Sequence, residues 1–151
     1  MNNYIESTVK SVGTYPIVWD VVNEAIDDNT NNFIKESPWK HVDDFVCKAF
    51  NAARSAAPSV GRFYNDYNIL ANTGWEKKKS NNVYKLVKDL HDRDCGITGV
   101  GLQAHIDTKF NEWDGVKANM KRYQDLGLEI HITELDVKCK TCGEKWSDSD
   151  L

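Results

Sequence analysis

Four largely apolar runs alternate with stretches of helical periodicity, and this alternation is what most restricts the fold. The runs are IVWDVV at 17–22, VGRFY at 60–64, ITGVGLQAHI at 97–106 and LEIHITELDV at 128–137. Apolar strands separated by helices are typical of a parallel sheet that is covered by helices. The 151 residues are enough for a single domain. The sequence therefore predicts an α/β fold with about four parallel strands.

The helical stretches carry apolar residues at intervals of three and four positions. One such stretch precedes the first strand and ends before Gly13. In the next, Ser37 and Pro38 fit an N-cap and a first-turn proline, so we expect one helix from there to Ala53. Two later helices are expected to end near Gly96 and Gly127.

Charge and hydropathy argue against two classes of partner. The net charge is −4 and the pI is about 5.5, which does not favour nucleic acid or an anionic membrane surface. No segment approaches the ~20 apolar residues of a membrane span. The stretch MNNYIESTVK also lacks the apolar core of a signal peptide. We therefore expect neither a nucleic-acid partner nor a membrane partner.

Polar side chains follow the predicted strands at one end. Asn23 and Glu24 follow the first strand, and Glu134 lies late in the last one. The two middle strands lead into Asn65, Asp66, Tyr67, Gln103 and His105. Ligands of such folds bind at the carboxyl ends of the strands, so these side chains define a candidate site.

Strand alternation refines this arrangement. Glu134 and Asp136 are two positions apart, so they point to the same face if the strand persists through both. Gln103 and His105 have the same spacing on the preceding strand. His105 could then lie between the two acids and orient Glu134.

Two carboxyl groups about 5 to 5.5 Å apart can cleave a glycosidic bond with retention. One carboxylate acts as the nucleophile, and the other donates a proton to the leaving oxygen and later activates water. Repulsion between the two charges separates their roles. Glu24 and Glu134 are the candidate pair.

Each of these residues also has an ordinary structural interpretation. A single Glu at a strand end is usually a solvated loop residue, and His105 alone would more often be a hydrogen-bonded structural histidine. We interpret His41 and His91 as structural because they fall in helical segments. His131 is out of phase with Glu134 and is expected to face the helices.

The cysteines give little functional information. Cys139 and Cys142 form a C-K-T-C spacing within the polar tail 138–151, which is predicted to be a loop. A zinc site would need a second ligand pair, and a redox pair would lie at a helix N-terminus. A loop disulfide or plain thiols are therefore favoured, and the state of Cys47 and Cys95 is left open.

Four sequence segments carry a family resemblance. WDVVNEA, FYNDYNI, GVGLQAHI and ITELDV occur in the order found in glycoside hydrolase family 10, the endo-β-1,4-xylanases. The chain resembles that family from about residue 5 to residue 137. The resemblance implies a (β/α)8 barrel, xylan as the substrate, and chemistry that needs no metal or cofactor.

The resemblance also implies individual roles. Glu24 would be the acid/base and Glu134 the nucleophile. Asn23 would hydrogen-bond the sugar 2-hydroxyl at the point of cleavage. His105 would touch the nucleophile, with Asp136 behind it.

The remaining site residues would shape the cleft. Gln103 and Asn65 would line its centre, and Tyr67 would lie on the leaving-group side. Asp66 would be a supporting residue beneath them.

The chain is shorter than the barrel that it resembles, which takes about 250 residues. It is similar to the portion from strand 4 to strand 7, so residues 1–151 are expected to be part of a single catalytic barrel. Family segments that hold the non-reducing side of the substrate with a Lys, a His and a Trp would precede it. We expect the isolated chain to be inactive or weakly active, and the complete parent to be a monomeric, extracellular enzyme, because polymeric xylan cannot enter a cell.

Two other functions stay open. A related β-1,4-glucanase would use the same pair of Glu residues, and a comparison of xylan with cellulose would separate the two activities. A non-catalytic carbohydrate-binding half barrel would bind xylo-oligosaccharides without turnover.

Overall fold

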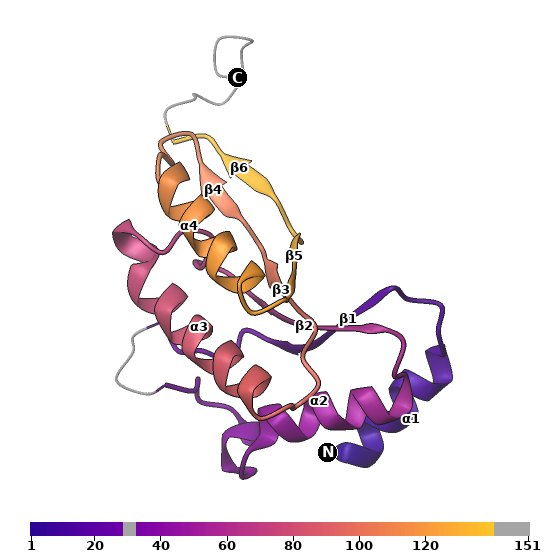
Figure 1. The fold of residues 1–151 in the computed structure, drawn as a ribbon. Helices are drawn as coiled ribbons and strands as arrows, with labels where there is room; N and C mark the ends of the chain where they lie inside the picture. Colours follow the sequence, from indigo (N-terminus) through magenta and orange to yellow (C-terminus); the bar gives the residue numbers. More distant parts are fainter. Residues whose placement is uncertain (29–32, 141–151) are drawn as a thin grey trace.

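A computed structural model describes residues 1–28 and 33–140, and its centre is a parallel sheet (Figure 1). The strands are β1 (Val18–Asn23), β2 (Gly61–Asp66), β3 (Gly99–Leu102) and β5 (Glu129–Ile132). They are ordered β1-β2-β3-β5, and every neighbouring pair is parallel. This confirms the predicted four-stranded parallel sheet.

Helices cover one face of the sheet; the first precedes β1, and the other three lie in the connections between successive strands of the sheet (Figure 1). They are α1 (Asn2–Val12), α2 (Phe45–Ala56), α3 (Lys77–Asp92) and α4 (Trp113–Gln124), with short 3-10 helices η1 (Pro38–His41) and η2 (Gly74–Glu76). Within the described ranges, no helix has both the length and the apolar character needed to cross a membrane.

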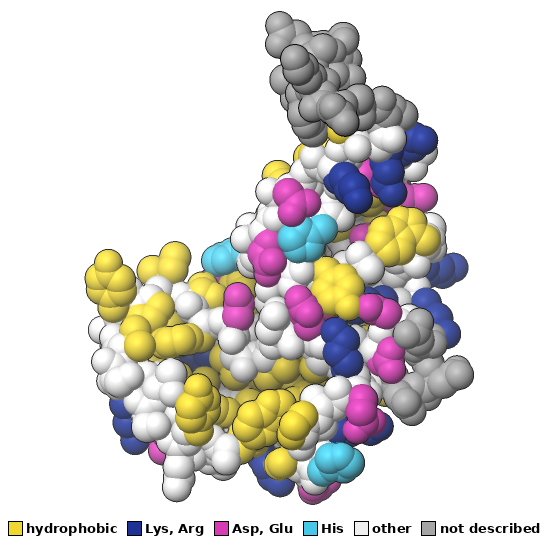
Figure 2. Space-filling model, turned by 180° about the vertical axis from the view of Figure 1, so that it is seen from behind, with side chains coloured by type: hydrophobic (Ala, Val, Ile, Leu, Met, Phe, Trp, Pro, Cys, Tyr) yellow, Lys and Arg dark blue, Asp and Glu magenta, His cyan; other side chains and the backbone are white. Residues whose placement is uncertain are grey.

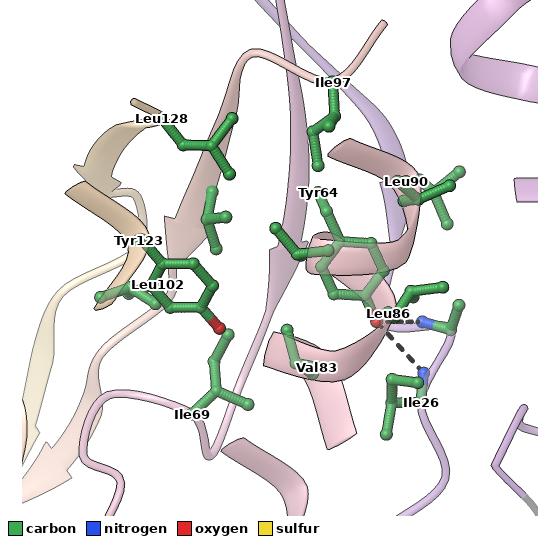
Figure 3. Close-up of a cluster of buried hydrophobic side chains, with 14 of the residues drawn as sticks. Ile26, Tyr64, Ile69, Val83, Leu86, Leu90, Ile97, Leu102, Tyr123 and Leu128 are labelled. Carbon is green, nitrogen blue, oxygen red and sulfur yellow. Dashed lines mark hydrogen bonds between the residues drawn. The ribbon is translucent and has the colours of Figure 1, made fainter. Parts of the chain in front are cut away.

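The core lies between the sheet and helices α2, α3 and α4. Tyr64 and Leu102 point from the strands into this layer, where they join buried aliphatic residues and Tyr123 (Figure 3). Val100 of β3 belongs to the same buried cluster. The Tyr64 hydroxyl accepts hydrogen bonds from the backbone N–H groups of Ala25, at 3.0 Å, and of the following residue. The core therefore fixes the backbone immediately after Glu24.

Two long apolar runs do not form single strands. The run 97–106 breaks at Ala104, whose φ is 62°, in the left-handed region that few non-glycine residues adopt. The run 128–137 breaks after β5 ends at Ile132. Beyond these breaks, β4 (His105–Asp107) and β6 (Asp136–Lys138) form a separate parallel pair in which His105 lies opposite Asp136.

The helix expected from Ser37 to Ala53 begins later than predicted. Pro38 starts the 3-10 helix η1, the chain then becomes extended at Val42, and α2 begins only at Phe45. Asp44 precedes it with φ 51°. Aspartate tolerates this left-handed conformation better than most residues, so the two helical segments are separated by a turn.

Cys47 in α2 forms a disulfide with Cys95, in the loop that follows α3. The bond links α2 to the loop after α3, and its two cysteines are 48 residues apart in the sequence. Cys139 is also disulfide-bonded. Cys142 and the rest of the predicted tail after residue 140 lie outside the described residues, so a disulfide within C-K-T-C stays a prediction.

Candidate active site

The carboxyl ends of the strands bring the predicted site residues together. Asn23 at the end of β1 lies opposite Asn65 in β2. Glu24 follows with φ 55°, and its backbone N–H donates to the Asn65 carbonyl at 2.9 Å. The positive φ turns the chain away from the strand direction, so Glu24 lies just beyond the end of β1, at the carboxyl edge of the sheet.

Three amide side chains connect the two glutamates. The Gln103 Nε2 group donates to Glu24 Oε1 at 3.0 Å and lies 3.5 Å from Asn23 Oδ1. Asn65 Nδ2 donates to Asn23 Oδ1 at 3.0 Å and to Glu134 Oε1 at 2.8 Å. A continuous series of hydrogen bonds therefore runs from Glu24 through Gln103, Asn23 and Asn65 to Glu134.

The orientation of the Asn65 amide is fixed from its other end. Thr133 Oγ1 donates to Asn65 Oδ1 at 2.7 Å, so the amide nitrogen must face Asn23 and Glu134. A Cβ at Gly101 would lie only 2.3 Å from Asn65 Oδ1. The glycine therefore makes room for the amide, and Thr133 is a site residue that the sequence analysis missed.

His105 links Glu134 to Asp136. Its Nδ1 lies 2.7 Å from Asp136 Oδ2, and its Nε2 lies 3.4 Å from Glu134 Oε2. The hydrogen bond with Asp136 raises the pKa of His105, and the charges of both acids add to this effect. The imidazolium form therefore persists to higher pH than in an isolated histidine.

Asp66 lies under the rim and is fully buried. It accepts hydrogen bonds from the Tyr64 hydroxyl at 2.6 Å and from the Tyr67 N–H at 2.9 Å. The Lys79 ammonium from α3 lies 2.8 Å from Asp66 Oδ1 and 2.7 Å from Asp28 Oδ1. Burial raises the pKa of Asp66, while Lys79 and the hydrogen bonds oppose that rise.

The same group of charges holds Tyr67. The Lys79 ammonium lies 3.2 Å from the centre of the Tyr67 ring, and the Tyr67 hydroxyl hydrogen-bonds Asp28. Lys35 Nζ donates to the Tyr67 hydroxyl at 3.3 Å and lies 3.7 Å from Glu24 Oε2. Tyr67 is thereby connected to Glu24, and every predicted site residue lies in one connected set of contacts.

Sequence reasoning missed the two lysines. Lys79 is four positions before Val83 on the apolar face of α3, and it is only 5% exposed. A charged residue within an apolar helix face was the available signal. Lys35 had no comparable signal, because its position depends on the backbone pairing of Ile26 with Ile34.

The expectation that His131 faces the helices is wrong. Its ring centre lies 4.5 Å from that of Phe63, whose ring in turn fills the space beside Gly99. Asp20 of β1 lies near both His131 and Glu134: partial burial and the charge of Glu134 raise the pKa of Asp20, and the charge of His131 opposes this rise. Asp20, His131 and Glu134 therefore lie on the same face of the sheet. The prediction failed because β5 ends at Ile132, and strand alternation does not extend to Glu134.

His41 and His91 remain outside this set. His41 is largely exposed beside Glu36, and His91 lies on α3 beside Asp92. On the face shown in Figure 2, histidine and acidic side chains lie beside exposed hydrophobic side chains.

Comparisons with known proteins identify the family of this chain. The sequence profile of glycosyl hydrolase family 10 matches residues 1–150. An endo-1,4-beta-xylanase from Geobacillus stearothermophilus is 37% identical over 139 residues, which cover 91% of this chain and 41% of that protein. Endo-1,4-beta-xylanase B from Neocallimastix patriciarum is 46% identical over 80% of this chain and 14% of its own length.

A solved structure shows the same fold. Xylanase 10B from Thermotoga petrophila RKU-1, in complex with xylobiose, has a TM-score of 0.85 and 33% identity. The superposition covers 98% of this chain and 43% of that chain. This chain therefore spans less than half the length of these relatives and forms part of a (β/α)8 barrel. It belongs to glycosyl hydrolase family 10.

Proposed function

We propose that the protein of which these residues form part hydrolyses internal β-1,4-xylosidic bonds of xylan with retention of configuration. The observation that carries this proposal is the unbroken series of amide hydrogen bonds between Glu24 and Glu134. The relatives named as endo-1,4-beta-xylanases and the xylobiose in the Thermotoga structure support xylan as the substrate class.

In the first step, a carboxylate oxygen of Glu134 attacks the anomeric carbon and the bond to the leaving oxygen breaks. Glu24 gives its proton to that oxygen, so the leaving sugar departs as a neutral alcohol. In the second step, Glu24 removes a proton from water, and the water oxygen displaces Glu134. Two inversions at the same carbon give net retention.

The surrounding groups hold Glu134 in place for this attack. The Asn65 amide binds one oxygen of Glu134 at 2.8 Å, and His105 faces the other. Two donors on different oxygens restrict rotation of the carboxylate. This matters because a displacement of about 1 Å can cost on the order of a hundredfold in rate.

The other predicted residues meet the sugar or support those that do. The Asn23 carbonyl oxygen already accepts from Asn65, so its amide nitrogen is available to donate to the sugar 2-hydroxyl. Gln103 lines the centre between the two glutamates, and Tyr67 takes the leaving-group side. Asp66 supports Tyr67 from below through the Tyr67 N–H.

Two alternatives share this geometry. A β-1,4-glucanase would use the same glutamates, so only substrate preference separates it from a xylanase. A non-catalytic binding protein would have no need for an ordered amide network that restrains Glu134, which favours an enzyme.

The test uses the full-length protein with xylan and with cellulose. We expect release of xylo-oligosaccharides, with the β-anomer appearing first when the products are followed by proton NMR. A preference for cellulose would establish the glucanase, and binding of xylohexaose without any hydrolysis would establish the binding protein.

The proposed enzyme acts as an extracellular monomer. The Cys47–Cys95 disulfide supports this location, because such bonds persist in oxidising compartments. The polymeric substrate supports it independently. Xylanase activity confined to washed, lysed cells would contradict the location, and a dimer in sedimentation equilibrium would contradict the monomer.

A further inference from the structure

A large, mostly exposed aromatic side chain lies beside the candidate site. Trp75, in η2, is 65% exposed. It borders a pocket of about 220 Å³ that reaches His105, which in turn contacts Glu134. Exposed aromatic surface beside a polar cleft is typical of a binding position.

The loop that carries Trp75 is firmly held. Thr73 Oγ1 donates to Glu112 Oε2 at 2.5 Å, which joins the loop after β2 to the segment that precedes α4. Gly74 has φ 55°, and a Cβ there would lie 2.7 Å from Glu112 Oε1. Only a glycine permits this close approach without strain.

The other side of Trp75 is fixed as well. Buried Glu76 accepts a hydrogen bond from the backbone N–H of Ala71 at 2.6 Å. The indole is therefore presented from a backbone anchored at both ends, rather than carried on a loosely attached loop. Such preorganisation reduces the entropy lost when a ligand stacks on the ring.

Polar groups share the lining of this pocket with the indole. Lys109, Asn111 and Glu112 line it with Trp75. Within the described part of the chain, the Asn111 side chain makes no hydrogen bond, so both its donor and its acceptor are available. A flat apolar face with hydroxyl-binding groups at its edge matches a pyranose, whose ring has an apolar C–H face and equatorial hydroxyls.

The position of the pocket indicates which part of a substrate it would meet. Trp75 and Tyr67 come from the same connection between β2 and α3. Tyr67 is linked to Glu24 through Lys35, and Glu24 is the proposed proton donor to the leaving sugar. Because Trp75 lies in the same connection as Tyr67, we assign it to the leaving-group side as well.

We propose that Trp75, with Lys109, Asn111 and Glu112, forms a subsite for a xylosyl unit on the leaving-group side, beyond the unit released at the cleaved bond. This inference rests on the proposed xylanase function. The subsite would make the enzyme favour long leaving groups over short ones.

The test compares two substrates in the full-length enzyme. Xylohexaose can fill the subsite, whereas an aryl β-xylobioside has a leaving group too short to reach it. In Trp75→Ala, the ratio of kcat/KM for xylohexaose to kcat/KM for the aryl xylobioside should fall about tenfold, which corresponds to ~1.4 kcal/mol. Cleavage of end-labelled xylohexaose should also shift toward bonds that leave fewer units on that side.

Three further variants make the result specific. Trp75→Phe keeps a flat ring and should retain most of the ratio, whereas Asn111→Ala removes a polar lining group and should lower it. Trp39→Ala removes another partly exposed indole, which does not line this pocket, and should leave the ratio at its original value.

The outcomes separate the subsite from the proposed function. If the unaltered enzyme cleaves neither substrate, the proposed function is wrong. If it cleaves both and Trp75→Ala keeps the ratio within twofold, only the subsite is wrong. An equal fall in Trp39→Ala would likewise overturn it, because the effect would then come from the loss of any exposed indole.

Discussion

Asn65 donates a hydrogen bond to Glu134 at 2.8 Å across 69 positions of sequence, and the same amide nitrogen also binds Asn23. Asn65 and Glu134 lie at the carboxyl ends of β2 and β5, which are not adjacent because β3 lies between them. The contact spans the gap above β3 because Gly101 leaves the space open. A small residue in one strand thus permits an amide in the next to position a carboxylate in a third.

Asn65→Ala should lower kcat by about a hundredfold, because Glu134 would lose the donor that fixes one of its oxygens. Its partners Asn23, Thr133 and Glu134 are exposed, so water can replace the lost hydrogen bonds and the unfolding free energy should change much less than kcat. Steady-state kinetics and urea unfolding measure the two effects. Thr133→Val is the matched control: it removes only the bond that orients the amide and should have a smaller effect on kcat. A kcat within threefold of the original in Asn65→Ala would show that the amide does not position Glu134.

Asp136→Asn should lower the pKa of His105, since the hydrogen bond with Asp136 is the largest cause of its rise. The folded state binds the His105 proton more tightly than the unfolded chain does. The resulting stabilisation is fully present below the unfolded pKa of about 6.5 and is lost as the pH rises through the higher folded value. Because the ring is partly exposed, solvent screens this contribution. NMR titration of the ring measures the shift, and an unchanged His105 titration in Asp136→Asn would contradict the assignment.

Lys79→Met should destabilise the fold by about 3–5 kcal/mol, because it leaves the buried carboxylate of Asp66 without its ammonium partner. The double variant Lys79→Met/Asp66→Asn removes both charges and should be more stable than Lys79→Met alone. Urea unfolding measures both variants. A loss below 1 kcal/mol in the single variant, or no recovery in the double variant, would mean that the pair does not hold the loop under Tyr67.

Much of this architecture could be predicted from the sequence because it depends on periodicity. Alternating apolar runs and helical faces predicted the parallel sheet. The rule that parallel strands end at one edge then brought Glu24 and Glu134 to the same rim. These inferences need no knowledge of side-chain packing.

The rest depended on single backbone angles and on long-range contacts. The left-handed conformation of Ala104 lets Gln103 reach Glu24 while His105 turns to Asp136, and nothing in the run GLQAHI marks that break. The end of β5 at Ile132 reversed the expected direction of His131. Cys47 could be paired with Cys95 only once α2 and the end of α3 were placed together.

Glu24→Ala in the full-length enzyme should lower the hydrolysis of xylan by about 10²–10⁴-fold, which is the usual contribution of general acid catalysis. Aryl xylosides with acidic phenol leaving groups should suffer far less in the first step, because those groups need little protonation. Comparing kcat/KM for the two substrate types measures the difference. An equal loss on both would point to a different proton donor.

The central claim is that Glu134 forms the covalent bond to the sugar while Glu24 transfers protons. The most direct measurement is to supply azide to Glu134→Ala of the full-length enzyme with an activated aryl xylobioside, and to determine the anomeric configuration of the product by NMR. The account predicts loss of hydrolysis and formation of the α-xylobiosyl azide, since azide would attack in place of Glu134 with one inversion. The matched variant Glu24→Ala should give the β-azide, because two inversions still occur there. Normal turnover in Glu134→Ala, or a β-azide from it, would contradict the account.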